Sequence, residues 1–257
     1  MAKPRLPGDL SARLHFKLKI SSAHSAATYP EYNKIWQDGE LITTLIFSKY
    51  SSGGTTSRDV GIAAYNSTYS KLRKTFGSPS YINDRFSGQP GVAHPTLEMH
   101  FKTSLGNLIV HMRLENSISE ADKHFVEWYR ERTRNSDLVI YNGHSGLGSN
   151  IDRLGKLGQF AAGQYQIFFI NGCGTFAYFS EDLIKAHGAV HPGAVWTKHL
   201  DVMTNTLASY FSRNAEVSLM LIQTILRQKE NYRQILKKID SRQRVLVDGE
   251  QDNLWRP

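Results

Sequence analysis

The residues best suited to covalent chemistry are His144 and Cys173, the single cysteine of the 257-residue chain. Each follows a short apolar run that ends in Asn-Gly, residues 138–141 before the histidine and residues 165–170 before the cysteine. A free thiol has a pKa of about 8.5 and needs a neighbouring base to become a nucleophile at neutral pH. An imidazole can take that proton and later give one to a leaving amine. The pair therefore has the chemistry of a thiol nucleophile with a histidine base.

The pattern around these residues predicts that they lie together. Both apolar runs are rich in β-branched and aromatic residues and are bounded by turn formers, which indicates buried strands. Residues 151–161 can form the crossover helix that two parallel strands require. The carboxyl ends of neighbouring parallel strands share one edge of an open sheet, where ligand sites gather. We therefore expect the ring of His144 and the sulfur of Cys173 at this edge, roughly 4 to 7 Å apart before substrate binds.

Other interpretations of the same residues are a structural thiol and a metal site. A lone cysteine at a strand end is commonly a small buried side chain, and the histidine would then be unrelated to it. The repeated order of strand, Asn-Gly and reactive residue favours catalysis, because loops after sheet strands carry function. His187, His191 and His199 could join the cysteine as zinc ligands, but their spacing matches no zinc pattern and no acidic or second cysteine ligand accompanies them. We expect no metal and no other cofactor.

The stretch 137–175 resembles the motif region of a known peptidase clan. Its order of apolar run, histidine loop with glycine, second apolar run, small residue and cysteine is similar to that of the clan containing caspases, metacaspases, legumain, gingipain, clostripain and separase. The resemblance covers residues 41–240. It implies an α/β fold, a three-layer caspase-like sandwich with a mostly parallel central sheet and helices on both faces. It also implies a cysteine endopeptidase that hydrolyses peptide bonds through a His144–Cys173 dyad and an acyl-enzyme intermediate.

The same resemblance implies oxyanion donors and a specificity pocket. The family usually has glycine directly after the histidine, whereas this chain has Ser145 followed by Gly146. The backbone N–H groups of Ser145 and Cys173 are the implied oxyanion donors. In this family the strand after the cysteine helix borders the pocket for the residue before the scissile bond, so Asp201 and Asn205 are candidate pocket residues, with a strand-end cap as the alternative. Asp201 at the pocket floor would favour Arg or Lys in the substrate.

Alternating strands and helices predict one α/β domain over residues 41–240. An extension with one strand, 1–40, precedes it, and a loosely held polar tail, 241–257, follows. The expected strands outside the motif are 14–20, 41–47, two within 97–114 joined near Gly106-Asn107, and 200–204. The expected helices are a short one around 32–36, then 62–76, one that follows a capping box at 117–120 and ends near 134, 175–186 and 215–239.

Composition narrows the class of protein. The chain is 40% hydrophobic and 21% charged, which is typical of a soluble globular protein. Its net charge of +8 is spread along the chain, and no nucleic-acid-binding motif accompanies it, so we expect a protein or peptide substrate and no nucleic acid. No apolar run approaches the ~18 residues of a membrane span. The first ten residues have no signal-peptide core, and the compartment stays open, including export after removal of a signal.

Two other functions stay open from the sequence. One is a non-catalytic caspase-like interaction module that keeps the dyad for packing, which Ser145 and the basic surface favour. The other is a serine hydrolase, because GHSGLG resembles a nucleophile elbow around Ser145. That motif requires glycine at position 147, where this chain has Leu147. Nothing in the sequence indicates the oligomeric state.

Overall fold

The computed structural model of the protein describes residues 27–179, 181–239 and 241–257. Its strands are β1 (Glu40–Ser48), β2 (Tyr81–Ile82), β3 (Thr96–Thr103), β4 (Gly106–Glu115), β5 (Leu138–Asn142), β6 (Gln166–Asn171), β7 (Leu200–Asn205) and β8 (Val245–Asp248). Its helices are α1 (Tyr32–Ile35), α2 (Val60–Phe76), α3 (Lys123–Asn135), α4 (Ser149–Leu157), α5 (Thr175–Tyr178), α6 (Glu181–Ala189), α7 (Asn214–Arg227) and α8 (Tyr232–Lys237). Four 3-10 turns are η1 (Gly146–Gly148), η2 (Trp196–Lys198), η3 (Phe211–Arg213) and η4 (Glu250–Asp252).

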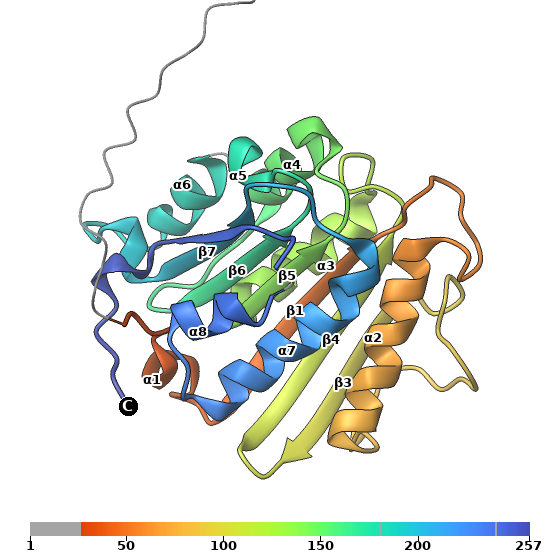
Figure 1. The fold of residues 1–257 in the computed structure, drawn as a ribbon, viewed down its shortest axis with the longest axis horizontal. Coiled ribbons are helices and arrows are strands. Elements are labelled where there is room, and N and C mark those ends of the chain that lie inside the picture. The colour runs from red at the N-terminus through yellow and green to blue at the C-terminus, as the bar shows by residue number, and fades with distance from the viewer. Residues whose placement is uncertain (1–26, 180, 240) are drawn as a thin grey trace, which may run out of the picture.

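The strands form one eight-stranded mixed sheet in the order β2-β3-β4-β1-β5-β6-β7-β8 (Figure 1). The five strands β4, β1, β5, β6 and β7 pair in parallel, and the pairs at both edges of the sheet are antiparallel. The expected α/β fold with a mostly parallel sheet is confirmed. The strand expected at residues 14–20 lies outside the described residues. None of the described helices is long and apolar enough to cross a membrane.

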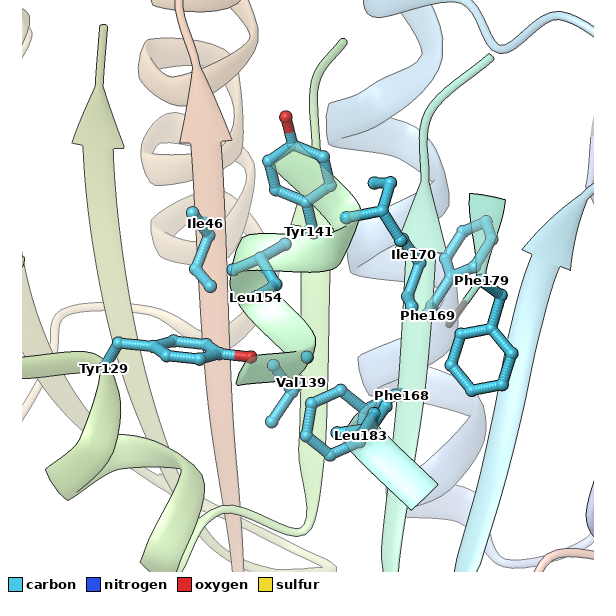
Figure 2. A pocket seen from close by; sticks show the side chains of 12 residues that line it. Ile46, Tyr129, Val139, Tyr141, Leu154, Phe168, Phe169, Ile170, Phe179 and Leu183 are labelled. Carbon is cyan, nitrogen blue, oxygen red and sulfur yellow. The ribbon is translucent and has the colours of Figure 1, made fainter. Parts of the chain in front are cut away.

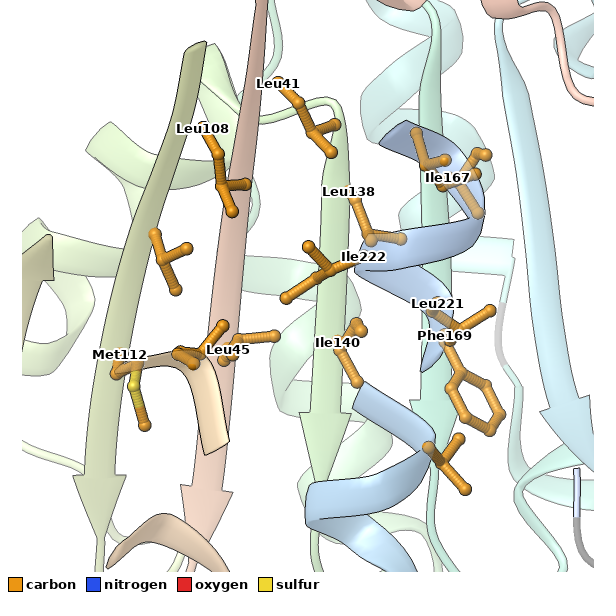
Figure 3. Packing of buried hydrophobic residues seen from close by; sticks show 14 of the residues in the cluster. Leu41, Leu45, Leu108, Met112, Leu138, Ile140, Ile167, Phe169, Leu221 and Ile222 are labelled. Atoms are coloured by element: carbon orange, nitrogen blue, oxygen red, sulfur yellow. The ribbon is translucent and has the colours of Figure 1, made fainter. Parts of the chain in front are cut away.

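Burial on both faces explains why the central strands are continuous apolar runs. Every residue of β5, β6 and β7 is buried, as is usual for parallel strands covered by helices. Successive side chains of a strand point to opposite faces, and here they join two separate core clusters. The first contains Leu138, Ile140, Ile167 and Phe169 with residues of α2, α7 and α8, and Figure 3 shows Leu221 and Ile222 of α7 over these strands. The second contains Val139, Tyr141, Phe168 and Ile170 with residues of α3, α4 and α6 (Figure 2).

Three helices differ from the sequence expectation: two are each divided into two helices, and one begins later than expected. The single helix expected over 215–239 is two, because Gln228 adopts a left-handed φ of 54° and Asn231 starts α8 in a capping box with Gln234. The helix expected over 175–186 is divided into α5 and α6. The helix expected after a capping box at 117–120 begins at Lys123, where the Asp122 carboxylate accepts the Phe125 N–H.

The segment expected to be a loosely held tail is packed onto the sheet. Residues 245–248 form β8 antiparallel to β7. The buried Asn253 donates from Nδ2 to Asp201 Oδ2 at 2.7 Å and to the Tyr29 carbonyl oxygen at 2.9 Å. The Trp255 ring meets Tyr32 edge-on with centroids 4.8 Å apart. The sequence expectation missed this because β8 is short and only half-buried, so its apolar pattern is weak.

Candidate active site

His144 and Cys173 follow the ends of two neighbouring parallel strands, as the sequence predicts. The last residues of β5 and β6 are register partners, and each reactive residue comes two positions later. The N–H of Gly143 donates to the carbonyl oxygen of Asn171 at 3.1 Å. A Cβ atom on Gly172 would lie 2.9 Å from the Gly143 carbonyl oxygen, so the two loops are in backbone contact. The structure therefore brings the imidazole and the thiol to the same edge of the sheet.

The ring of His144 is oriented by the loop that follows β1. Its Nε2 lies 3.1 Å from the carbonyl oxygen of Tyr50. A carbonyl oxygen only accepts, so Nε2 carries the proton in this hydrogen bond and Nδ1 of the neutral ring is left as an acceptor. The rings of Tyr50 and Phe211 lie against the imidazole, with centroids 5.0 Å and 4.9 Å from it. These contacts select one tautomer and one position of the ring.

The backbone of His144 is also held from several sides. Its N–H donates to Ser48 Oγ at 3.3 Å, and its carbonyl oxygen accepts from the Tyr141 hydroxyl at 2.6 Å and Asn150 Nδ2 at 2.9 Å. Only glycine fits at position 143, because a Cβ atom there would come within 2.0 Å of Ser48 Oγ. Gly143, directly after β5, therefore has a steric role as well as a turn-forming one.

The thiol of Cys173 is exposed, and its surroundings are polar backbone. Its Sγ lies 3.8 Å from the carbonyl oxygen of Ser209, within reach of a weak S–H hydrogen bond. The next residue, Gly174, has a left-handed φ of 59° and donates its N–H to the Leu207 carbonyl oxygen at 2.9 Å. The helix that follows, α5, has only four residues, so its dipole is a smaller aid to a thiolate than the long helix expected from the sequence. The nucleophile candidate is accessible and fixed by the loop after β7.

Two unpaired backbone N–H groups lie in the loops that carry His144 and Cys173. Among the described residues, no acceptor receives a hydrogen bond from the N–H of Ser145 or from that of Cys173. The Ser145 nitrogen would be 3.3 Å from a Cβ atom placed on Gly172, so it lies beside the cysteine loop. The Ser145 side chain is 8% exposed, whereas Cys173 is exposed. Unpaired N–H groups at a site of this kind can stabilise a developing negative charge.

A network of buried side-chain amides lies beneath the same edge. Asn171 Nδ2 donates to Asn142 Oδ1 at 2.9 Å and to Asn214 Oδ1 at 3.0 Å. Asn171 Oδ1 accepts from Asn205 Nδ2 at 3.0 Å and from Gln243 Nε2 at 2.7 Å. Cross-bonded amides of this kind hold the ends of β5, β6 and β7 together without any charge. Asn205, a candidate pocket residue from the sequence, thus lies at the same edge as His144 and Cys173, and its amide is hydrogen-bonded within this network.

Asp201, the second candidate pocket residue, lies at the opposite end of the sheet. Its register partner on β6 is Ile167, and the β5 partner of that residue is Leu138, the first residue of its strand. The structure therefore does not bring Asp201 to the edge that holds His144 and Cys173. The expected preference for Arg or Lys loses the geometric basis that a pocket-floor carboxylate would supply.

The Asp201 carboxyl is instead a buried anchor. Its Oδ2 accepts from the hydroxyls of Tyr165 and Tyr232, each at 2.5 Å, and from Asn253 Nδ2. Complete burial raises the pKa of Asp201 to about 7, against the three hydrogen bonds, which lower it. The group connects β7 to the residue before β6, to α8 and to the C-terminal segment. In the described contacts, the Asp201 carboxyl therefore has a structural role: it holds α8 and the C-terminal segment against the sheet.

The three histidines considered for zinc stack on one another. The rings of His187 and His191 have centroids 4.7 Å apart, and those of His191 and His199 are 4.1 Å apart. His191 Nε2 accepts the Gly163 N–H at 2.9 Å, so one of its nitrogens already has a partner. Within the described ranges, no group of three or more His, Cys, Asp or Glu side chains is arranged to hold a metal ion.

A small enclosed cavity lies away from the candidate site. It has a volume of about 10 Å³ and lies in the second core cluster, where Figure 2 shows Val139, Leu154, Phe168 and Leu183 around it. That volume is about the space of one water molecule, and the lining is apolar. The cavity is a packing gap between the sheet and its helices.

The sequence missed two kinds of residue at the site. Tyr50 acts through its carbonyl oxygen, which every residue has, so no side-chain type could have indicated it. The amide network had a signal in the sequence, because β5, β6 and β7 all end in asparagine.

In comparisons with known proteins, no family model and no curated protein matches this chain.

Proposed function

We propose that this protein is a cysteine endopeptidase of the caspase-like class, with Cys173 as the nucleophile and His144 as the base. The observation that carries the proposal is the hydrogen bond between His144 Nε2 and the Tyr50 carbonyl oxygen, at the strand edge that also holds the thiol. It leaves Nδ1 as the acceptor of the neutral ring. An oriented proton acceptor beside an accessible thiol is the minimum that nucleophilic cysteine catalysis requires.

The proposed reaction begins when His144 Nδ1 takes the proton of Cys173 Sγ. The thiolate attacks the carbonyl carbon of a peptide bond, and the N–H groups of Ser145 and Cys173 stabilise the oxyanion that forms. The imidazolium then protonates the leaving amine as the C–N bond breaks, which leaves an acyl-enzyme. A water molecule deprotonated by His144 hydrolyses the thioester and releases the carboxylate product and the free thiol.

The finer fold assignment is part of the same proposal. A three-layer caspase-like sandwich requires helices on both faces of the sheet, and the two separate core clusters support it, with α2, α7 and α8 in one and α3, α4 and α6 in the other. Residues 41–240 would form this domain, with β8 added to the edge of the sheet beyond β7.

A serine hydrolase has less support from the geometry. The Ser145 side chain is buried, and Leu147 stands where a nucleophile elbow needs glycine. The exposed Cys173 is the more accessible of the two nucleophiles. We therefore propose that the thiol of Cys173, and not the hydroxyl of Ser145, attacks the substrate carbonyl carbon.

Labelling with a thiol-alkylating peptide ketone tests the proposal on the full chain. We expect labelling at Cys173 that is at least about a hundredfold slower in His144→Ala, because the general base is lost. Cys173→Ala should abolish both labelling and peptide hydrolysis while the circular dichroism spectrum stays the same. Equal labelling rates in the native chain and His144→Ala would remove the dyad, and a non-catalytic interaction module would then account better for the fold.

A further inference from the structure

We infer that Asp59 is a positioning residue for the proposed dyad: its carboxylate holds the loop after β1 and thereby fixes the Tyr50 carbonyl that orients His144. This inference rests on the proposed function for its catalytic consequence, but the orientation of the ring can be measured separately. It concerns a residue that touches neither the thiol nor the imidazole.

The Asp59 carboxylate accepts four backbone hydrogen bonds from two segments. Oδ1 accepts from the N–H groups of Gly61 at 2.8 Å and Ile62 at 3.1 Å, in the first turn of α2. The same oxygen accepts from the Tyr50 N–H at 3.0 Å, and Oδ2 accepts from the Ser51 N–H at 2.8 Å. One side chain therefore connects the start of a 17-residue helix to the loop that carries the Tyr50 carbonyl.

Two of these bonds are more than a helix cap requires. An N-cap side chain satisfies free N–H groups in the first helical turn, which the bonds to Gly61 and Ile62 already do. Asp122, the cap of α3, accepts the Phe125 N–H of its own helix and, among the described residues, no hydrogen bond from a neighbouring loop. The additional bonds from Tyr50 and Ser51 leave the helix and hold the neighbouring loop. Burial raises the pKa of Asp59, but the four N–H bonds lower it more, so the carboxylate stays charged at neutral pH.

Close packing makes the loop and the helix one unit. A Cβ atom on Gly61 would lie 2.2 Å from the Ser48 carbonyl oxygen and 2.8 Å from Lys49 Cα, so only glycine lets the helix start against the end of β1. A Cβ atom on Gly54 would lie 2.7 Å from Asp59 Oδ2, so the far side of the loop also closes on the carboxylate. Between these contacts, Tyr50 is held at its N–H by Asp59 and presents its carbonyl oxygen to His144.

Loss of the carboxylate should release the Tyr50 carbonyl without removing it. The imidazole would then populate both neutral tautomers, and the fraction with a free Nδ1 would fall. A catalytic group that is misplaced by about 1 Å costs on the order of a hundredfold in rate. The effect should therefore fall on the chemical step and leave substrate binding nearly unchanged.

Asp59→Ser separates positioning from helix capping. Serine is a good N-cap, so it keeps the cap of α2, but its single oxygen is too short to accept also from Tyr50 and Ser51. Asp122→Ser is the matched control, because it makes the same change at the cap of a helix whose capping residue holds no other loop. Asp59→Asn is a second variant of nearly the same shape, in which an amide N–H would face the Ser51 N–H.

Nitrogen-15 NMR of His144 in the full chain is the decisive measurement. We expect mainly the Nε2–H tautomer in the native chain and in Asp122→Ser, and a mixture in Asp59→Ser, with Asp59→Asn in between. For peptide hydrolysis we expect kcat to fall by about 10- to 100-fold in Asp59→Ser with KM nearly constant, and to stay within about twofold in Asp122→Ser.

The outcomes distinguish this inference from the proposed function. A folded Asp59→Ser with the native His144 tautomer and native kcat would overturn the role of Asp59. A shifted tautomer in Asp59→Ser, together with no peptide hydrolysis by the native chain, would support the positioning role and reject the peptidase. Equal losses in Asp59→Ser and Asp122→Ser would assign the effect to helix capping and reject the inference.

Discussion

Acid should destabilise this protein through buried imidazoles, and His187 has the most strongly lowered pKa among the described histidines. The side chain is 1% exposed, and among the described residues neither ring nitrogen has a hydrogen-bond partner. Burial, together with the neighbouring His191 and His199, lowers the pKa of His187 from 6.5 to about 3. The folded protein therefore keeps this ring neutral at a pH at which the unfolded chain binds a proton. The stability that depends on the neutral ring is present above pH 6.5 and is lost as the pH falls below it.

The size of the effect follows from the two pKa values. Each pH unit between them costs about 1.4 kcal/mol, so at pH 5 the contribution of His187 to the free energy of unfolding should be about 2 kcal/mol lower than at pH 7.5. The contributions of two buried carboxyls to the free energy of unfolding rise as the pH falls, opposite to that of His187, because burial raises the pKa of Asp137 to about 8 and that of Asp201 to about 7. The test is therefore a comparison of variants at two pH values, in which these groups cancel.

Urea denaturation of the native chain and of His187→Leu, each at pH 7.5 and pH 5, measures this difference. Leucine fills the site with apolar atoms and removes two unpaired nitrogens, so the variant should gain about 2 kcal/mol over the native chain on going from pH 7.5 to pH 5. His124→Leu on the exposed face of α3 is the matched control and should show no such gain. If the difference between His187→Leu and the native chain were the same at both pH values, the reasoning from burial would be wrong.

Three further predictions concern the site and the anchor. Cys173→Ala should abolish peptide cleavage with the fold intact, because replacing the thiol by hydrogen removes no obligatory hydrogen bond, and retained cleavage in this variant would reject the dyad. His144→Ala should reduce kcat by about a hundredfold to ten-thousandfold, because the general base is lost. Ser145→Gly keeps the backbone N–H, so kcat should hold or rise, and a sharp loss would mean that the hydroxyl takes part. Asp201→Ala removes the acceptor shared by three buried donors and should lower the free energy of unfolding by about 3 kcal/mol in urea titrations, whereas an unchanged midpoint would contradict its role as an anchor.

Much of the sheet could be predicted because burial on both faces leaves a strong sequence pattern. The strands β1, β5 and β6 have strongly apolar centres, and the sequence predicts all three and β7 at nearly their observed bounds. The sequence does not predict β8, because this strand is short and only half-buried and its apolar pattern is weak. The break between α7 and α8 was missed because the apolar spacing continues across it, although Asn231 and Gln234 have the residue types of a capping box.

By itself the sequence determined which strands carry His144 and Cys173, because the two apolar runs, the Asn-Gly turns that end them and the crossover segment between them are patterns local to the chain. Only the tertiary structure decided which nitrogen of His144 is free, because that depends on a backbone carbonyl from a loop 94 positions earlier in the chain. It also decided that Asp201 is an anchor and no pocket residue of this edge, since its three donors come from Tyr165 just before β6, from α8 and from the C-terminal segment. Pairing between distant segments has no signature in the local pattern of either one, and it appears only when the chain is folded.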